Sequence, residues 1–389
     1  MTDMPAGDTQ YVRDDFRDFA RTGAGTLAGR FMRRFWHPVW AADQLPPGTA
    51  QSVKLMGEEF TLYRGSGGAV HAVGHRCPHR GTILSVGWVE DDCIRCLYHG
   101  WKYDATGQCI EQPGEGAGFA EKVTIPSYPA EEYLGLIFVY LGEGAAPPLP
   151  RYPQFENEGV LDIEWYTRKC NYFQNLENGV DEAHVYFTHR AIQFEQIAYD
   201  QVIPLVEAEE TDYGIVQYGT RKNGARRVTH LIMPNILYMR LPSRSPDIKE
   251  PNHYLSWRVP VDDETHKSFI VQLVHAMGDI ADRFRAERKA ARERLGRFGS
   301  VEELSDAIVA GKLSWAAVKD HPGLINIQDN ATQLGQGAIA DRRGERLGRT
   351  DAAVILLRRL WERELRAIAE GTAPTAWKSG ERLEALSGA

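Results

Sequence analysis

Two short pairs of metal-binding side chains constrain this chain more than any other feature of its sequence. Cys77 and His79 are one residue apart, Cys96 and His99 are two residues apart, and sixteen residues separate the pairs. Proteins clamp compact metal centres between two such loops, because each loop orders both of its ligands at once. The pattern therefore predicts a metal centre held between two loops.

The types of residue in these pairs decide between three chemistries. Five cysteines in 389 residues, three of them within residues 77–96, form a poor disulfide framework and suit thiols that are kept reduced. A structural zinc site would accept two cysteines and two histidines, but small zinc modules usually pair cysteine with cysteine and histidine with histidine. Mixed pairs suit a Rieske [2Fe–2S] cluster, in which two thiolates hold one iron and two imidazoles the other. Three thiols are left as buried groups with no metal role: Cys93, Cys109 and Cys170.

A second group of potential ligands follows about eighty residues later. The stretch "NYFQNLENGVDEAHVYFTH" contains Glu177, Asp181, His184 and His189 within thirteen positions. Non-haem Fe(II) oxygenases need two histidines and one carboxylate on one side of the iron. His184 and His189 are five residues apart, which a regular α-helix turns by about 140°. We therefore expect either a π-type widening or a helix that ends between them.

Four segments resemble the Rieske non-haem iron oxygenases, specifically the terminal oxygenase (α) subunits of the phthalate-dioxygenase-like branch. They are "CPHRG" with "CLYHGW", the Asn171–His189 stretch above, "NIQDNATQLGQGAIADRRGERLG", and "GAGTLAGRFMRRFWHPVWAADQLPPG" near the N-terminus. The resemblance runs from about Thr22 to Arg366. It implies that the ligands of the Rieske cluster are Cys77, His79, Cys96 and His99.

The same resemblance assigns the second iron. It makes His184 and His189 ligands of a mononuclear non-haem Fe(II), with Asp329 as the third. Spacing alone selects no third ligand, and Asp341 and Glu345 are the competing carboxylates nearby in the sequence. Asp181 becomes the bridge that carries electrons to this iron from His99 of a neighbouring subunit, and Glu177 and Asn178 are expected to be structural.

The resemblance also implies the fold, which is α+β. We expect an N-terminal segment over residues 1–33 that packs on the catalytic domain, a Rieske β-domain over 34–148, and a catalytic domain over 149–389. The catalytic domain is expected to be helix-grip-like, with a curved antiparallel sheet covered by helices. The residue pattern agrees: residues 51–142 read as short strands broken by turns, and "EGAAPPLPRYPQF" reads as a linker. Apolar residues spaced by three and four predict a helix that ends near Gly371.

The function implied is that of the oxygenase component of a multicomponent system. It would use O2 and electrons from NAD(P)H, delivered by a separate reductase with or without a ferredoxin, to hydroxylate an aromatic substrate, carboxylated in part of the branch. Monooxygenation or oxidative O- or N-demethylation is the alternative reaction, and a Rieske electron-transfer protein or a zinc-stabilised interaction protein is the alternative class. Head-to-tail assembly into a homotrimer, or a dimer of trimers, is expected.

Charge and hydropathy limit the partners and the compartment. The formal charge of −8 argues against a nucleic-acid-binding surface, and no apolar run is long enough to span a membrane. With an N-terminus that lacks a signal peptide and an odd number of cysteines, we expect a cytoplasmic protein. The basic stretch "RKNGARRVTH" offers Arg226 and its neighbours to an anionic substrate or to a ferredoxin, but solvated loop charge is the more common role of such residues.

Overall fold

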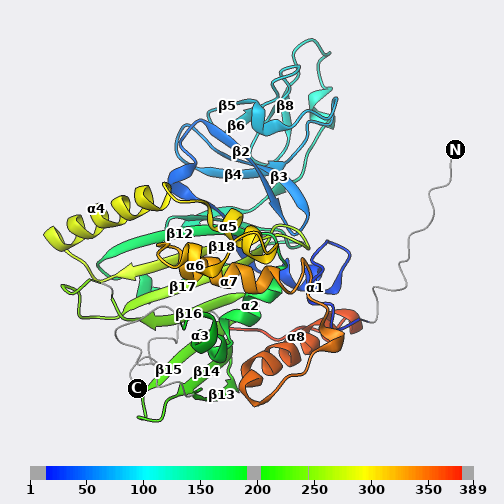
Figure 1. Ribbon diagram of the computed structural model, residues 1–389. Helices are drawn as coiled ribbons and strands as arrows, with labels where there is room; N and C mark the ends of the chain where they lie inside the picture. The colour runs from blue at the N-terminus through cyan, green and yellow to red at the C-terminus, as the bar shows by residue number, and fades with distance from the viewer. Residues whose placement is uncertain (1–14, 191–202, 244, 379–389) are drawn as a thin grey trace. The chain divides into compact units, whose positions relative to one another are not determined.

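The computed structural model describes residues 15–190, 203–243 and 245–378 and divides the chain into two compact units (Figure 1). The smaller unit comprises residues 22–150, and the larger joins residues 15–21 to residues 151–378. Residues 22–33, expected on the catalytic domain, thus belong to the smaller unit. Arg33 explains the difference, since its guanidinium donates to the Thr22 carbonyl at 2.8 Å and to the Met56 carbonyl at 3.3 Å.

The smaller unit is built from short antiparallel strands in three sheets, ordered β1-β11-β10, β2-β3-β4-β9 and β5-β6-β7-β8. Their bounds are β1 (Trp36–Ala41), β2 (Thr49–Leu55), β3 (Glu58–Arg64), β4 (Val70–Gly74), β5 (Trp88–Glu90), β6 (Cys93–Arg95), β7 (Lys102–Tyr103), β8 (Cys109–Glu111), β9 (Ser127–Tyr128), β10 (Ala130–Tyr133) and β11 (Leu136–Tyr140). Helix α1 (Leu27–Met32) precedes them, and the 3-10 helices are η1 (Ala42–Gln44), η2 (Leu84–Val86) and η3 (Ala120–Lys122). The expected run of short strands and hairpins is confirmed.

The "GAGTLAG" segment at the start of this unit has a steric explanation. Thr26 caps α1, its hydroxyl accepting from the Gly29 amide at 3.0 Å. A Cβ added at Gly29 would lie 2.1 Å from the Gly23 carbonyl oxygen and 2.4 Å from that of Thr22. Only glycine allows the chain to fold back this closely on the helix.

The larger unit is organised around one antiparallel sheet of seven strands in the order β12-β18-β17-β16-β15-β14-β13. The strands are β12 (Val160–Arg168), β13 (Leu205–Glu210), β14 (Gly214–Thr220), β15 (Arg226–Ile232), β16 (Ile236–Leu241), β17 (Asn252–Pro260) and β18 (His266–Val274). The helices are α2 (Tyr172–Gly179), α3 (Glu182–Thr188), α4 (Gly278–Leu295), α5 (Val301–Val309), α6 (Trp315–Val318), α7 (Leu324–Leu334) and α8 (Ala352–Glu370), with η4 (Pro153–Phe155), η5 (Arg342–Gly344) and η6 (Arg349–Asp351). The architecture is α+β, as predicted.

Helices α2, α3, α7 and α8 lie along one face of this sheet (Figure 1). Contacts identify the strand positions on that face: Ser268 of β18 accepts from the Asn175 side chain of α2 at 3.0 Å, and Arg258 of β17 pairs with Ser268 across the sheet. Because side chains alternate along a strand, Tyr254 and Arg258 share this helix-covered face.

Helix α8 confirms the C-terminal helix expected from the apolar spacing. It ends at Gly371, which adopts a positive φ of 70°, and its predicted face is buried: Val354, Leu357, Trp361, Leu365 and Ile368. Trp361 packs edge-on against Phe173 of α2, with ring centroids 5.3 Å apart. Within the ranges given above, no helix combines the length and apolar composition that crossing a membrane requires.

Candidate metal centres

The two cysteine–histidine loops of the smaller unit share one backbone design. In the first, the Gly81 amide donates to the Cys77 carbonyl at 2.9 Å, and in the second the Gly100 amide donates to the Cys96 carbonyl at 3.1 Å. Both glycines have a φ of 75°, a conformation that glycine adopts without steric cost. Each loop is therefore a tight turn that holds a cysteine at its start and a histidine near its end.

The side chains of these turns converge. Cys77 and Cys96 are each 2% exposed and belong to one buried cluster. The rings of His79 and His99 lie 4.4 Å apart between centroids, and His79 stacks on Trp101 at 4.6 Å with the ring planes within 5°. Trp101 belongs to the same buried cluster as the two cysteines, so it links the pair of thiols to the pair of imidazoles.

The chemistry of this set fits a [2Fe–2S] cluster. Both cysteines are free thiols, so no disulfide accounts for their proximity. The His79 Nδ1 atom is buried without a hydrogen-bond partner, which is costly unless a ligand meets it. Burial raises the pKa of the Cys77 thiol, although the Tyr103 hydroxyl, 3.2 Å from its Sγ, acts in the opposite direction. A bound metal would reverse that preference, because it holds the thiolate form.

In the larger unit, α3 positions the two histidines of the second group. The helix begins after Asp181, whose Oδ1 accepts from the amides of Ala183 and His184 at 2.9 and 3.2 Å. It ends at Thr188, so that His189 lies just beyond it with φ −101° and ψ 15°. Of the two expected arrangements, the helix that ends between the histidines is confirmed.

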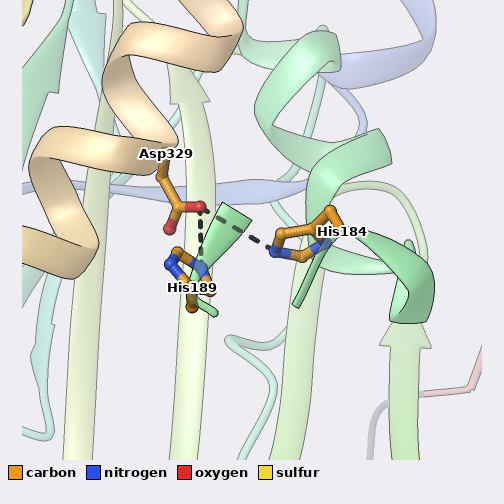
Figure 2. Close-up of side chains that lie close together, drawn as sticks. All are labelled: His184, His189 and Asp329. Atoms are coloured by element: carbon orange, nitrogen blue, oxygen red, sulfur yellow. Dashed lines mark ion pairs between the residues drawn. The ribbon is translucent and has the colours of Figure 1, made fainter. Parts of the chain in front are cut away.

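Asp329 of α7 is the carboxylate that meets both imidazoles (Figure 2). Its Oδ1 lies 3.2 Å from the His189 Nε2 and 3.8 Å from the His184 Nε2. Potential ligand atoms of all three residues lie within 4.8 Å of one another, and the Asp329 Oδ1 is buried without a hydrogen-bond donor. Two imidazoles and one carboxylate directed at a common point are the donor set of a mononuclear Fe(II) site.

The other nitrogen of each imidazole is engaged elsewhere. The His184 Nδ1 makes a short contact with the main-chain carbonyl of Asp181, and the His189 Nδ1 lies 3.0 Å from the Gln328 Oε1. Both acceptors fix the proton on Nδ1 and leave the Nε2 lone pairs facing Asp329. Gln328 was not among the predicted site residues; its position directly before Asp329 was the available signal.

The pKa values of the triad reflect burial and mutual contact. Burial lowers the pKa of His184, although the nearby Asp329 carboxylate opposes the shift. Burial acts in the same direction on His189, but its contacts with the Asp329 carboxylate and Gln328 outweigh it and raise its pKa. For Asp329, burial is outweighed by its contact with His189 and by the Arg168 and histidine charges, and its pKa is lowered. The carboxylate is therefore ionised and able to bind a cation.

The competing carboxylates are engaged elsewhere. Glu177 accepts from Arg342 at 2.8 Å and Arg358 at 2.6 Å, which ties α2 to η5 and α8 and confirms a structural role. The exposed Asp341 forms an ion pair at 2.7 Å with Arg343, two residues further along the chain. Glu345 pairs with Arg358 at 2.5 Å. Among the residues that the structure describes, only Asp329 joins the two histidines in a potential metal-binding group.

Comparison with known proteins assigns the family. Residues 35–129 match the Rieske [2Fe-2S] domain. The chain is 30% identical over 367 residues to the oxygenase subunit of 5,5'-dehydrodivanillate O-demethylase from Sphingobium sp. (strain NBRC 103272 / SYK-6), covering 92% of this chain and 81% of that protein. The chain belongs to the oxygenase subunits of the Rieske oxygenases.

Two further proteins match most of the length of this oxygenase. Phenoxybenzoate dioxygenase subunit alpha from Ectopseudomonas oleovorans is 30% identical over 373 residues, covering 90% of this chain and 84% of that protein. The terminal oxygenase of carbazole 1,9a-dioxygenase from Nocardioides aromaticivorans IC177 has the same fold, with a TM-score of 0.64 at 19% identity, covering 86% and 95% of the two chains.

Family membership determines the cofactors and the type of reaction. The oxygenase is an oxidoreductase that incorporates oxygen, and it uses a Rieske [2Fe–2S] cluster, a mononuclear iron and electrons derived from a reductase. Both sets of donor residues described above fit these groups. In each set one buried atom lacks a hydrogen-bond partner, the Nδ1 of His79 in the smaller unit and the Oδ1 of Asp329 in the larger.

Proposed function

We propose that this oxygenase hydroxylates an aromatic substrate, with the mononuclear iron held by His184, His189 and Asp329. The observation that carries the proposal is the convergence of both Nε2 atoms on one ionised, otherwise unpartnered carboxylate oxygen. Three protein ligands leave positions open for O2 and substrate. The dioxygenase relative that acts on phenoxybenzoate supports an aromatic ring as the target.

We assign the Rieske cluster to Cys77, His79, Cys96 and His99, within a Rieske domain over residues 34–148, and the iron to a catalytic domain over 149–389. When bound, the two centres supply electron transfer and oxygen activation. The protein's own residues hold the ligands in place: the Asp181 carbonyl and Gln328 fix the imidazole tautomers.

Asp181 is proposed as the bridge between subunits. Its Oδ1 caps α3, whereas no described residue supplies a hydrogen bond to its Oδ2. That oxygen is available to accept from an imidazole N–H, which we assign to the partner subunit's His99 in a C3 homotrimer or a dimer of trimers.

A separate reductase, with or without a ferredoxin, completes the system. Five free cysteines support placing it in the cytoplasm.

A second candidate reaction is oxidative O-demethylation of an aromatic ether. It is favoured by the similarity to the O-demethylase oxygenase subunit, which extends over 92% of this chain. Both reactions require the same two centres, so that product analysis distinguishes them: demethylation releases formaldehyde, whereas ring hydroxylation retains every carbon of the substrate.

The proposal is tested by metal analysis followed by oxygen uptake. The purified holoenzyme should contain about three irons per chain and show a Rieske EPR signal on reduction. With a surrogate reductase and NADH, aromatic acids and aromatic methyl ethers should stimulate O2 consumption, and label from 18O2 should enter the product. His184→Ala should retain the Rieske signal but lose label incorporation. A colourless zinc protein, or a Rieske protein with no second iron and no substrate-dependent O2 uptake, would refute the proposal.

A further inference from the structure

Arg258 is a buried cation on the sheet face that the helices cover. Its backbone is fixed by Asn235, which donates to the Arg258 carbonyl at 2.6 Å and accepts from its amide at 3.0 Å. Only 6% of the residue is exposed. The guanidinium is therefore held at a defined place, away from bulk water.

The guanidinium has few partners there. Its Nε and Nη1 atoms are buried without a hydrogen-bond acceptor, and its side-chain contact is with the Tyr254 hydroxyl. No carboxylate of the described residues lies within ion-pair distance of it. The buried carboxylates of the larger unit other than Asp329 are already paired: Glu182 with Arg227 at 3.4 Å, Asp162 with Arg288 at 2.7 Å, Glu177 with Arg342 at 2.8 Å and Glu364 with Arg363 at 3.3 Å. A buried, unpaired cation is costly, so that an unfilled partner is expected.

The surroundings favour an anion as that partner. The Tyr254 hydroxyl that contacts the guanidinium is uncharged near neutral pH, because burial raises the pKa of this tyrosine above its ordinary value of about 10. Burial opposes the charge of Arg258, but the charge of Asp329 is among the influences that raise its pKa, which places Arg258 within the electrostatic reach of the candidate iron site. The single carboxylate of Asp329 does not cancel the charge of an Fe(II) ion, so the iron centre supplies no spare negative charge to Arg258.

A second buried cation on the same face adds to the positive charge. Arg168 is 3% exposed, lies over the Tyr166 ring at 4.5 Å and donates to the Asn175 side-chain oxygen at 3.3 Å. These partners are neutral. Arg168 thus donates to a neutral group and has no ion pair among the described residues, whereas Arg258 has two buried nitrogen donors without an acceptor.

We infer that Arg258, with Tyr254 beside it, is the subsite that binds the carboxylate of an aromatic acid substrate. The inference rests on the proposed function and narrows the substrate class from aromatic compounds to aromatic acids. It also replaces the basic stretch at residues 221–227 as the origin of any preference for anions. Arg226 of that stretch is half-exposed, lies over the Tyr218 ring at 4.1 Å and faces Glu207 at 3.9 Å. Arg227 is paired with Glu182.

The test measures binding to the iron-loaded enzyme by anaerobic titration calorimetry. The probes are benzoate, phthalate and 3-phenoxybenzoate, each compared with its neutral primary amide. A charge-assisted hydrogen bond in a buried site gives an expected preference of about ten-fold or more for at least one acid over its amide. Arg258→Met should reduce this preference to about one-fold, and Arg258→Lys, which keeps the charge, should retain part of it. Arg226→Met is the matched control and should leave the preference unchanged.

Iron content and the Rieske absorbance verify that each variant is assembled. If Arg258→Met does not assemble, Tyr254→Phe and Arg258→Lys decide, since both should weaken the acids relative to the amides. A wild-type enzyme that binds no acid better than its amide, or a preference that persists in Arg258→Met, overturns the subsite. O2 uptake separates this failure from that of the proposed function: neutral aromatic compounds that still stimulate uptake leave the function standing, and no stimulation by any aromatic compound rejects it.

Discussion

Asp181 has two roles in the proposal, to cap helix α3 and to carry electrons between subunits. Substitutions at this position can test the two roles separately. Its Oδ1 accepts two main-chain amides at the start of α3, at 2.9 and 3.2 Å. Asp181→Ala removes this cap, and the expected cost is about 1 kcal/mol of unfolding free energy. For a unit of this size, that cost lowers the melting temperature by about 2–4 °C. Asp181→Asn keeps a side-chain oxygen for the cap and should melt within about 1 °C of the wild type.

The two variants should nevertheless behave alike in electron transfer. Each lacks the second carboxylate oxygen, which we assign to the partner subunit's His99, so re-oxidation of the reduced Rieske cluster in a single turnover should slow by roughly 10- to 100-fold or more in both. The His184 imidazole should remain oriented, because its contact is to the main-chain carbonyl of Asp181 rather than to the carboxylate.

The assay is stopped-flow absorbance of the Rieske cluster after reduced enzyme and substrate are mixed with O2, with thermal melting and iron content measured on the same samples. If Asp181→Asn re-oxidises its cluster at the wild-type rate, Asp181 is only a helix cap and the bridge is refuted. If Asp181→Asn loses its mononuclear iron, its slow re-oxidation no longer supports the bridge.

Three further outcomes follow from contacts described above. Gln328→Leu should remove the acceptor that orients His189 and increase Fe(II) loss to a chelator by about 10- to 100-fold, whereas Gln328→Glu should retain most of the iron. Glu177→Gln leaves the paired Arg342 without its counter-charge and should destabilise the larger unit by about 3 kcal/mol in denaturant titrations, with wild-type Rieske absorbance. Burial lowers the pKa of His37 to about 4, so the unfolded chain binds the extra proton first and stability falls as the pH drops from about 6.5 toward 4, by up to about 3 kcal/mol. His37→Gln should flatten that dependence for the smaller unit, and an unchanged slope would contradict it.

Local patterns predicted the features that depend on neighbours in the chain. The end of α8 at Gly371, the hairpins of the smaller unit and the turn after Cys77 all follow from spacing and residue type over a few positions. The end of α3 before His189 was one of two arrangements that the spacing of five allowed.

Features that join distant parts of the chain were beyond such patterns. Asp329 meets His189 across 140 positions of sequence, and only the resemblance to a family singled it out. Arg258 gave no signal of its own, and Gln328 gave only its place directly before Asp329, because their roles depend on which side chains the sheet and α7 bring beside them. The grouping of residues 22–33 with the smaller unit rests on tertiary contacts of Arg33, which no local pattern reveals.

The adjacency of Gln328 and Asp329 has a mechanical consequence. Because both lie on α7, any small sliding of this helix carries the oxygen beside the His189 Nδ1 and the oxygen beside its Nε2 together. The His189 ring thus contacts α7 at both of its nitrogen atoms. His184 contacts α7 only through its Nε2, because its Nδ1 faces the main chain of its own turn. A displacement of α7 relative to α3 would therefore change the 3.8 Å separation between the Asp329 Oδ1 and the His184 Nε2 with no contact at the opposite nitrogen of His184 to move with it.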